Sequence, residues 1–226
     1  MKKLKPEDIL DLREYEKARE EFRKKIIELK RIRRIGVGPF ISLVFENLET
    51  MRFQVQEMAR AERIIDEEVL RQELAVYNPL IPDKGEISVT LLIELTSKED
   101  LYEWLPKLVG IETAVYIDIE FTAQDLKSLK TQKSLSPSAI LEPNYPLSPD
   151  GKMILTKKAE VEKSHEDMLT RSDITSSVHY LKFSLDTFER ELFTIGTPVI
   201  AIKHKFYSYK VDISEPLKES IFSDWL

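Results

Sequence analysis

The sequence predicts an α+β fold: one domain over residues 1–226, with a mixed or mostly antiparallel sheet packed by two long N-terminal helices. Three observations support this prediction. Apolar residues recur at helical spacing in two long segments of the N-terminal third. Short segments that alternate apolar and polar residues follow, as in half-buried strands. Glycine and proline separate these segments.

Composition limits the classes of protein to which the chain can belong. Hydrophobic residues make up 42% and charged residues 33%, as in a soluble globular protein. The absence of cysteine excludes disulfides, zinc ribbons, cysteine-ligated iron–sulfur clusters and thiol catalysis in this chain. The charged N-terminus lacks a secretory signal, and no apolar run reaches the roughly 18 residues that a membrane span needs. We therefore expect a cytoplasmic protein that does not enter a membrane.

The charge is negative overall but unevenly distributed. A net charge of −6 argues against nucleic-acid binding. Residues 23–34 nevertheless hold seven cations against only Glu28. They could bind an anionic partner, but a solvated helix C-terminus, where cations favour the dipole, is the preferred interpretation.

The first helix is expected over residues 6–33. Pro6 suits a first helical turn, and Gly36 and Gly38 mark the end. A packing seam recurs at spacings of three and four. It consists of Leu12, Tyr15, Phe22, Ile26 and Leu29.

A strand is expected over residues 41–46, followed by a second helix that begins near Glu49 or Thr50 and ends before Tyr77. One line of this helix is apolar and would be buried, and the opposite row is polar and would face solvent. The apolar line holds Met51, Val55, Met58, Ile65 and Val69, and the polar row holds Gln56, Arg60, Arg63 and Glu67.

Glu62 lies in the middle of the apolar line, which makes it the most informative residue of the segment. A buried carboxylate must pair with a cation, bind a metal, accept hydrogen bonds or remain protonated. The preferred explanation is a structural salt bridge, or a position at the edge of the apolar line that remains in contact with solvent. The alternative is a catalytic or ligand-binding carboxylate.

A second strand is expected over residues 87–94. Glu94 then lies off its apolar face, as Glu46 does on the preceding strand. If the two strands are neighbours, both carboxylates could meet Arg60 or Arg63.

The remaining elements follow in order. The surest strand covers residues 113–121, because its apolar and polar residues alternate cleanly. Residues 122–156 form a proline-rich insertion that we expect to be mobile. Further helices are expected at 97–105, 157–169, 185–193 and 215–225, and further strands at 175–184, 199–204 and 206–213.

Several segments resemble a bacterial protein family of unknown function. The most specific is Gln54-Val55-Gln56-Glu57-Met58 through Arg60-Ala61-Glu62-Arg63-Ile64. Others include Glu7-Asp8-Ile9-Leu10 with Tyr15 and Arg19, Phe45-Glu46-Asn47 with Thr50, Tyr77-Asn78 and Val178-His179-Tyr180-Leu181. The resemblance implies cytoplasmic proteins whose genes often lie beside rubrerythrin-like and iron–sulfur oxidoreductase genes. The chain has His204-Lys205-Phe206-Tyr207 where the family tends to have His-Pro-x-Tyr.

Motifs for metal or nucleophilic chemistry are weak, and we predict neither a metal nor another cofactor. Only Glu162 and His165 show the Glu-x-x-His spacing of di-iron sites. Glu62 and Asp66 could hold Mg²⁺ or Mn²⁺, but only weakly. A strand histidine such as His179 is more often structural than a catalytic base.

Two hypotheses of function remain. In the first, the protein is a non-catalytic accessory protein that binds a protein partner, such as a redox or stress-response enzyme; a homodimer is also open. In the second, it is an enzyme or small-ligand binder for an anionic substrate, built on the helix at residues 54–63, with Glu62 as the best catalytic candidate. The ligand-binding set of this second hypothesis is Glu46, Gln54, Glu57, Arg60, Glu62, Arg63, Tyr77 and Asn78.

Overall fold

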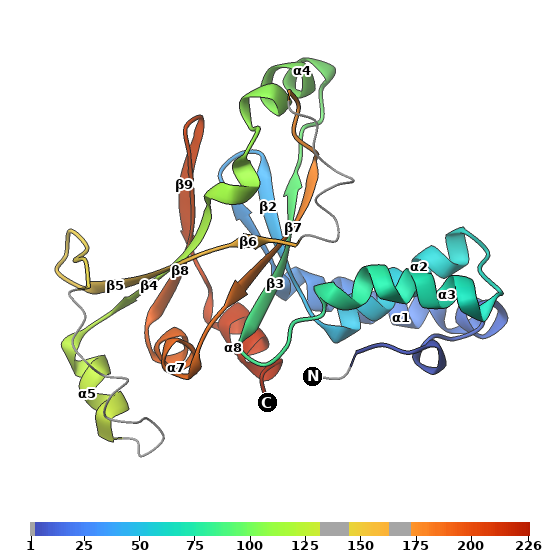
Figure 1. Cartoon of the computed structure of the whole chain (residues 1–226), viewed down its shortest axis with the longest axis horizontal. Coiled ribbons are helices and arrows are strands. Elements are labelled where there is room, and N and C mark those ends of the chain that lie inside the picture. The colour runs from blue at the N-terminus through green and yellow to red at the C-terminus, as the bar shows by residue number, and fades with distance from the viewer. Residues whose placement is uncertain (1–2, 132–144, 163–172) are drawn as a thin grey trace.

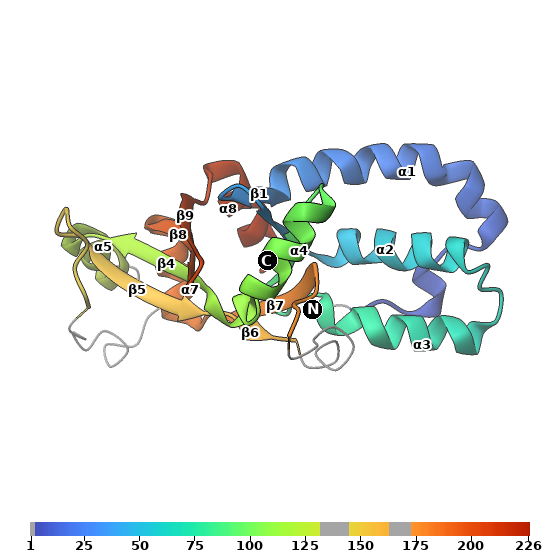
Figure 2. The same ribbon diagram turned by 90° about the horizontal axis from the view of Figure 1, so that it is seen from above.

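A computed structural model of the chain describes residues 3–131, 145–162 and 173–226, and it confirms the α+β class (Figure 1). The single sheet that the sequence led us to expect is wrong, because the strands divide into two antiparallel sheets. The N-terminal helices project to one side of these sheets instead of covering them (Figures 1 and 2).

Sheet A has five strands in the order β1-β2-β3-β7-β6, and sheet B has four in the order β5-β4-β8-β9. The strands of sheet A are β1 (Arg34–Val37), β2 (Ile41–Glu46), β3 (Glu86–Ile93), β6 (Glu160–Val161) and β7 (Val178–Ser184). Those of sheet B are β4 (Val115–Phe121), β5 (Met153–Lys158), β8 (Thr197–His204) and β9 (Tyr207–Asp212).

The larger hydrophobic core draws on both sheets. In β4 the buried residues are Val115, Ile117, Ile119 and Phe121, in strict alternation with half-buried polar ones, as predicted. β2, β3 and β7 contribute their own buried apolar residues to the same cluster. In the described part of the chain, the helices that accompany the sheets are α4 (Lys98–Lys107), α5 (Ala123–Thr131), α7 (Thr187–Ile195) and α8 (Glu215–Ser223).

A helical lobe extends from the sheets and has a separate core. It consists of α1 (Leu12–Arg33), α2 (Leu48–Ala61), α3 (Glu67–Tyr77) and the N-terminal arm, which we define as residues 3–11. Figure 2 shows α2 between α1 and α3. The buried apolar residues of this second core are Leu4, Met51, Val55, Leu74, Leu80 and Ile81. Because Leu4 is one of them, the arm is part of the lobe and not a loose terminus.

The first predicted helix begins later than expected. Residues Pro6–Asp8 form a separate 3₁₀ turn, and α1 starts at Leu12. The carboxylate of Asp11 accepts hydrogen bonds from the backbone N–H groups of Arg13 and Glu14, which is N-cap geometry. The seam is confirmed at Tyr15 and Ile26, which are buried.

The second predicted helix is wrong as a single element, because it breaks between Ala61 and Glu67. Arg63 takes a left-handed backbone conformation with φ of 55°. Asp66 then caps α3 by accepting from the N–H groups of Glu68 and Val69. The apolar line of the prediction therefore does not continue through the break.

Two expectations for the C-terminal half also change. The first residues of the predicted helix at 157–169 instead complete β5 and form β6, and residues 163–172 lie outside the described part of the chain. The predicted insertion at residues 122–156 begins with helix α5 and ends in β5, which pairs with β4. Residues 132–144 of that insertion are not described.

A buried arginine joins the lobe to the sheets and to the C-terminal helix. Arg33 is 1% exposed, and its Nε donates to the carbonyl of Phe45 at 2.7 Å. Its guanidinium also donates to Ser220 Oγ at 2.9 Å and forms an ion pair with Asp224. Burial raises the pKa of Asp224, while Arg33 acts in the opposite direction. The sequence analysis placed Arg33 in a solvated basic run, and this assignment is wrong for that residue.

Candidate functional site

Glu57 holds α1 against α2. Its carboxylate accepts from Arg19 Nε at 2.8 Å and Arg19 Nη2 at 2.9 Å, and the Tyr15 hydroxyl donates to it at 2.5 Å. The Arg19 hydrogen bonds are the main cause that lowers the pKa of Glu57 to about 2, against the opposing effect of burial. This predicted ligand-binding residue therefore serves an internal contact between two helices.

The lowered pKa of Glu57 predicts an acid-sensitive lobe. The free energy gained from this carboxylate is present above the unfolded pKa of about 4.5 and is lost as pH falls toward about 2. Since the side chain is 26% exposed, we expect Glu57→Gln to cost only about 1–2 kcal/mol near pH 7. Urea unfolding of the parent and of Glu57→Gln should show that the difference between their free energies of unfolding decreases from pH 7 to pH 3.

Glu21 provides the matched control for that titration. It pairs with Lys25 on the surface of α1 and is 77% exposed. Lys25 also lowers the pKa of Glu21, but solvent screens this exposed pair, so Glu21→Gln should change the stability profile much less than Glu57→Gln does. If the difference in free energy of unfolding between the parent and Glu57→Gln stays constant from pH 7 to pH 3, the Glu57 carboxylate does not contribute to stability through its titration.

Two side-chain amides clamp the N-terminal arm onto the lobe. Gln56 accepts from the Leu10 N–H and donates to the Leu10 carbonyl, both at 2.9 Å. Asn78 accepts from the Leu4 N–H at 2.8 Å and donates to the Leu4 carbonyl at 2.9 Å. At neutral pH a side-chain amide offers a donor and an acceptor side by side, as pairing with both backbone groups of one residue requires. The expected solvent position of Gln56 is wrong: it is 1% exposed, because the arm covers it.

Glu62 does not lie in a buried stripe, which corrects the central expectation of the sequence analysis. It is the exposed C-cap residue of α2, where the helix ends. Instead, burial raises the pKa of Glu73, and the charge of Glu62 adds to that shift. Burial also raises the pKa of Tyr77, and the adjacent Gln54 side chain partly opposes it.

The remaining predicted residues are Arg60, Arg63 and Glu46. Glu46 lies near Tyr180, as Tyr77 does: burial is the main cause that raises the pKa of Tyr180, and both neighbours raise it further. Arg60 Nε donates to Glu16 of α1 at 2.6 Å, and Arg63 is exposed in the turn after α2. Glu46 is 4% exposed within sheet A, where one of its oxygens accepts from Thr90 Oγ1 at 2.7 Å.

Glu46 and Glu94 do not meet Arg60 or Arg63. The strand register aligns Glu46 with Ser88, and Glu94 pairs with Arg34 near the other end of β3. The structure therefore does not assemble the eight predicted residues into one site.

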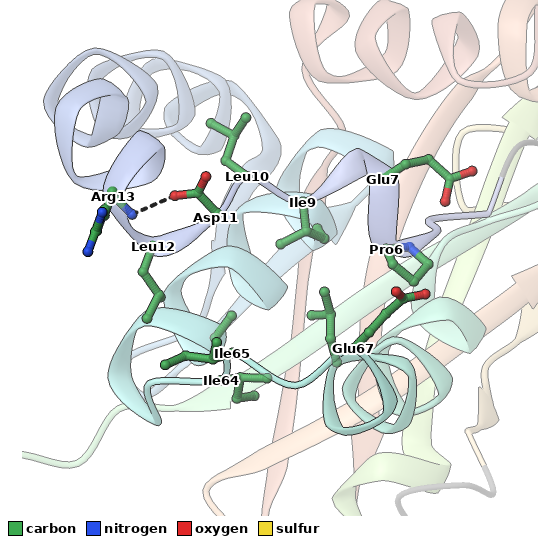
Figure 3. A pocket seen from close by; sticks show the side chains of 12 residues that line it. Pro6, Glu7, Ile9, Leu10, Asp11, Leu12, Arg13, Ile64, Ile65 and Glu67 are labelled. Atoms are coloured by element: carbon green, nitrogen blue, oxygen red, sulfur yellow. Dashed lines mark hydrogen bonds between the residues drawn. The ribbon is translucent and has the colours of Figure 1, made fainter.

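An open groove lies at the tip of the lobe (Figure 3). It has a volume of about 820 Å³ and lies between the arm, the end of α2 and the start of α3. Its walls are mainly apolar. The apolar lining includes Ile9, Leu10, Leu12, Ile64, Ile65 and Leu70.

The turn between α2 and α3 exposes an isoleucine at the edge of this groove. The Ile64 N–H donates to the carbonyl of Ala59 at 2.9 Å, and the left-handed Arg63 reverses the chain. Ile65 is left 88% exposed, and Leu10 across the groove is 41% exposed. Adjacent exposed apolar side chains in a groove mark an interaction site more often than isolated ones do.

Sequence reasoning missed this groove, although one signal was present. Ile64 and Ile65 stand directly before Asp66, an N-cap residue type. An apolar pair just outside a helix start can lie on the surface, whereas the same pair inside a helix joins its buried face. Because the sequence analysis predicted one continuous helix, it placed this pair inside the helix and did not identify it as exposed.

The two described histidines, His179 and His204, lie beside internal hydrogen-bonding partners. Within the described ranges, no three histidine or acidic side chains gather as a metal would need. His179 is buried, which lowers its pKa, and its Nε2 lies 2.9 Å from both Ser176 O and Thr175 Oγ1. His204 Nε2 lies 3.2 Å from the carbonyl of Val109. His165 is outside the described residues.

Comparison with known proteins gives a family and a structural relative. A family model described as "Protein of unknown function (DUF3501)" matches residues 3–133 and 130–225. A crystal structure of a novel protein of unknown function from Burkholderia pseudomallei K96243 is 26% identical to this chain. That structure has a TM-score of 0.77, and the match covers 99% of both chains. No match was found among curated proteins. In the described part of the chain, no helix has the length and apolar character of a membrane span.

Proposed function

Since the chain belongs to the DUF3501 family, whose description assigns no activity, we propose from the geometry that this protein is a non-catalytic accessory protein that binds a partner protein. The partner would occupy the groove at the tip of the helical lobe. The observation that carries the proposal is Ile65, which is 88% exposed beside an apolar groove of about 820 Å³.

Several contacts favour this function over an anionic small ligand. Arg60 is paired with Glu16, and Arg19 is paired with Glu57, so both guanidinium groups have internal partners. Glu7, Asp11 and Glu67 line the groove against one cation, Arg13, so its charge would repel an anion.

The identity of the partner is a separate part of the proposal. The resemblance to a family encoded beside rubrerythrin-like and iron–sulfur oxidoreductase genes favours a redox or stress-response enzyme in the cytoplasm. The groove itself supports protein binding of a general kind.

Site-specific crosslinking in cells tests the proposal. A photo-crosslinking amino acid at position 65 should yield one discrete adduct with another protein. Position 102 is the matched control, because Tyr102 is 81% exposed but lies on α4. An adduct at position 65 alone would support the proposal, whereas no adduct, or the same adducts at both positions, would overturn it.

A further inference from the structure

The tip of the lobe carries a concentrated negative charge. Residues 4–16 and 59–73, which include every residue that lines the groove, together hold ten carboxylates against five cations, a local net charge of −5. The carboxylates are Glu7, Asp8, Asp11, Glu14, Glu16, Glu62, Asp66, Glu67, Glu68 and Glu73. Three of these carboxylates, those of Glu7, Asp11 and Glu67, line the groove itself against one cation, Arg13. Because an excess of negative charge attracts cations and repels anions, the occupant should be basic.

Backbone hydrogen bonds at the groove limit the conformation of the occupant. The N–H and carbonyl groups of Leu4 and Leu10 are bonded to Asn78 and Gln56. The Ile9 N–H donates to the Pro6 carbonyl at 3.1 Å, so the arm is folded onto itself and is not a free strand edge. An occupant cannot extend a sheet here and must satisfy its own backbone groups, which an α-helix does.

We infer that the groove binds a basic amphipathic helix of the partner protein. This inference rests on the proposed function and specifies the chemistry of its partner. One apolar face of the helix, with side chains at i, i+3 or i+4 and i+7, would contact Ile65, Leu10 and Leu70. Flanking lysine and arginine residues would face the carboxylates of the rim, such as Glu7 and Glu67.

A second copy of this chain is the alternative occupant that a test must separate. The basic segment at residues 23–34 exposes Ile27 by 53% and Ile32 by 46%. That segment is joined to the sheets through buried Arg33, so it could approach the groove of another copy only with its whole domain. Light scattering therefore accompanies the binding measurement.

Fluorescence anisotropy with three labelled peptides of about 18 residues, or five helical turns, tests the inference. One is an amphipathic leucine–lysine helix, the second has glutamate in place of lysine, and the third is a scrambled leucine–lysine sequence without an apolar stripe. The amphipathic basic peptide should bind at least tenfold more tightly than either of the others. Ile65→Ser should weaken this binding about tenfold, an expected loss of about 1.4 kcal/mol.

The requirement for negative charge is tested by replacing carboxylates with lysine, both on the rim of the groove and at a distant surface position. Glu7→Lys with Glu67→Lys should weaken binding of the basic peptide, whereas Glu99→Lys on α4 should not. Binding should also fall between about 50 and about 300 mM salt, since exposed charges are screened over that range.

The outcomes separate this inference from the proposed function. Equal binding of the acidic peptide, or basic-peptide binding that Ile65→Ser leaves unchanged, would overturn the basic helix even if the crosslink at position 65 captured a protein. A dimer that Ile65→Ser converts to monomer would assign the groove to a second copy and also overturn it. If position 65 gives no adduct in cells, the proposed function itself fails.

Discussion

Replacement of Arg33 with methionine should destabilise the protein by about 3–5 kcal/mol, because it leaves the buried carboxylate of Asp224 without its cation. The side chain of Asp224 is 11% exposed, and its other described side-chain partner is Asn47 Nδ2, at 3.1 Å. Arg33→Met also removes the donor that the Phe45 carbonyl accepts from inside the structure. Urea unfolding at neutral pH measures the loss.

A surface arginine and a double variant make this prediction specific. Arg31 lies two residues away and is 80% exposed, so Arg31→Met should change the free energy of unfolding by less than about 0.5 kcal/mol. Arg33→Met combined with Asp224→Leu should recover part of the loss, because no unpaired charge remains buried. If Arg33→Met costs no more than Arg31→Met, the ion pair is not what joins the lobe to α8.

Local sequence patterns predicted the type of most elements, and they did so for physical reasons. The alternation in residues 115–121 reflects one face of β4 in the core and one outside it, so period alone identifies the strand. The helix expected at residues 97–105 is confirmed as α4, and the Ser97 hydroxyl caps it by accepting from the Asp100 N–H at 3.0 Å.

The division into two sheets could not be predicted in the same way. Whether β3 pairs with β7 or with β4 depends on contacts between residues almost a hundred positions apart, such as Thr90 with Tyr180. Several strands have the same alternation of apolar and polar residues, so the local sequence does not determine which strands pair or in which register. The two strands that carry Glu46 and Glu94 are neighbours, as the sequence analysis considered, but their antiparallel register puts the two carboxylates at opposite ends of the pair and away from Arg60 and Arg63.

The candidate site was misread because helical periodicity continued across a break. Asp66 is a good N-cap residue, yet its position was also compatible with the longer helix that the sequence analysis predicted. Nothing in the local sequence indicates that Arg63 takes a φ of 55°. The same periodicity placed Gln56 on a solvent face, because it takes no account of an arm more than forty residues earlier in the chain. Residues whose partners are distant in sequence were therefore the ones assigned incorrectly.

Gln56→Glu should release the N-terminal arm at neutral pH. The carboxylate keeps an acceptor for the Leu10 N–H but presents a second acceptor to the Leu10 carbonyl, in a position that is 1% exposed. We expect amide hydrogen exchange in residues 4–11 to speed up roughly tenfold to hundredfold, equivalent to about 1.4–2.8 kcal/mol. Gln72→Glu, on the exposed face of α3, is the control and should leave exchange in the arm unchanged.

The same variant should regain its arm in acid, which distinguishes a broken clamp from general damage. A protonated glutamic acid offers one donor and one acceptor, as the glutamine did, so the folded arm favours the protonated form and raises the pKa of the introduced carboxyl group above its unfolded value of about 4.3. The arm contacts are then fully present below that value and are lost as pH rises through the folded pKa. The ratio of exchange rates between variant and parent should therefore fall as pH is lowered from about 7.5 toward about 5, whereas the same ratio for Gln72→Glu should remain close to 1.

The binding measurement should show the same pH dependence. Because Ile9 and Leu10 form one wall of the groove, release of the arm in Gln56→Glu should also weaken binding of the basic peptide. Rapid exchange that does not respond to pH would mean that Gln56 supports the arm through its shape alone and not through its paired hydrogen bonds.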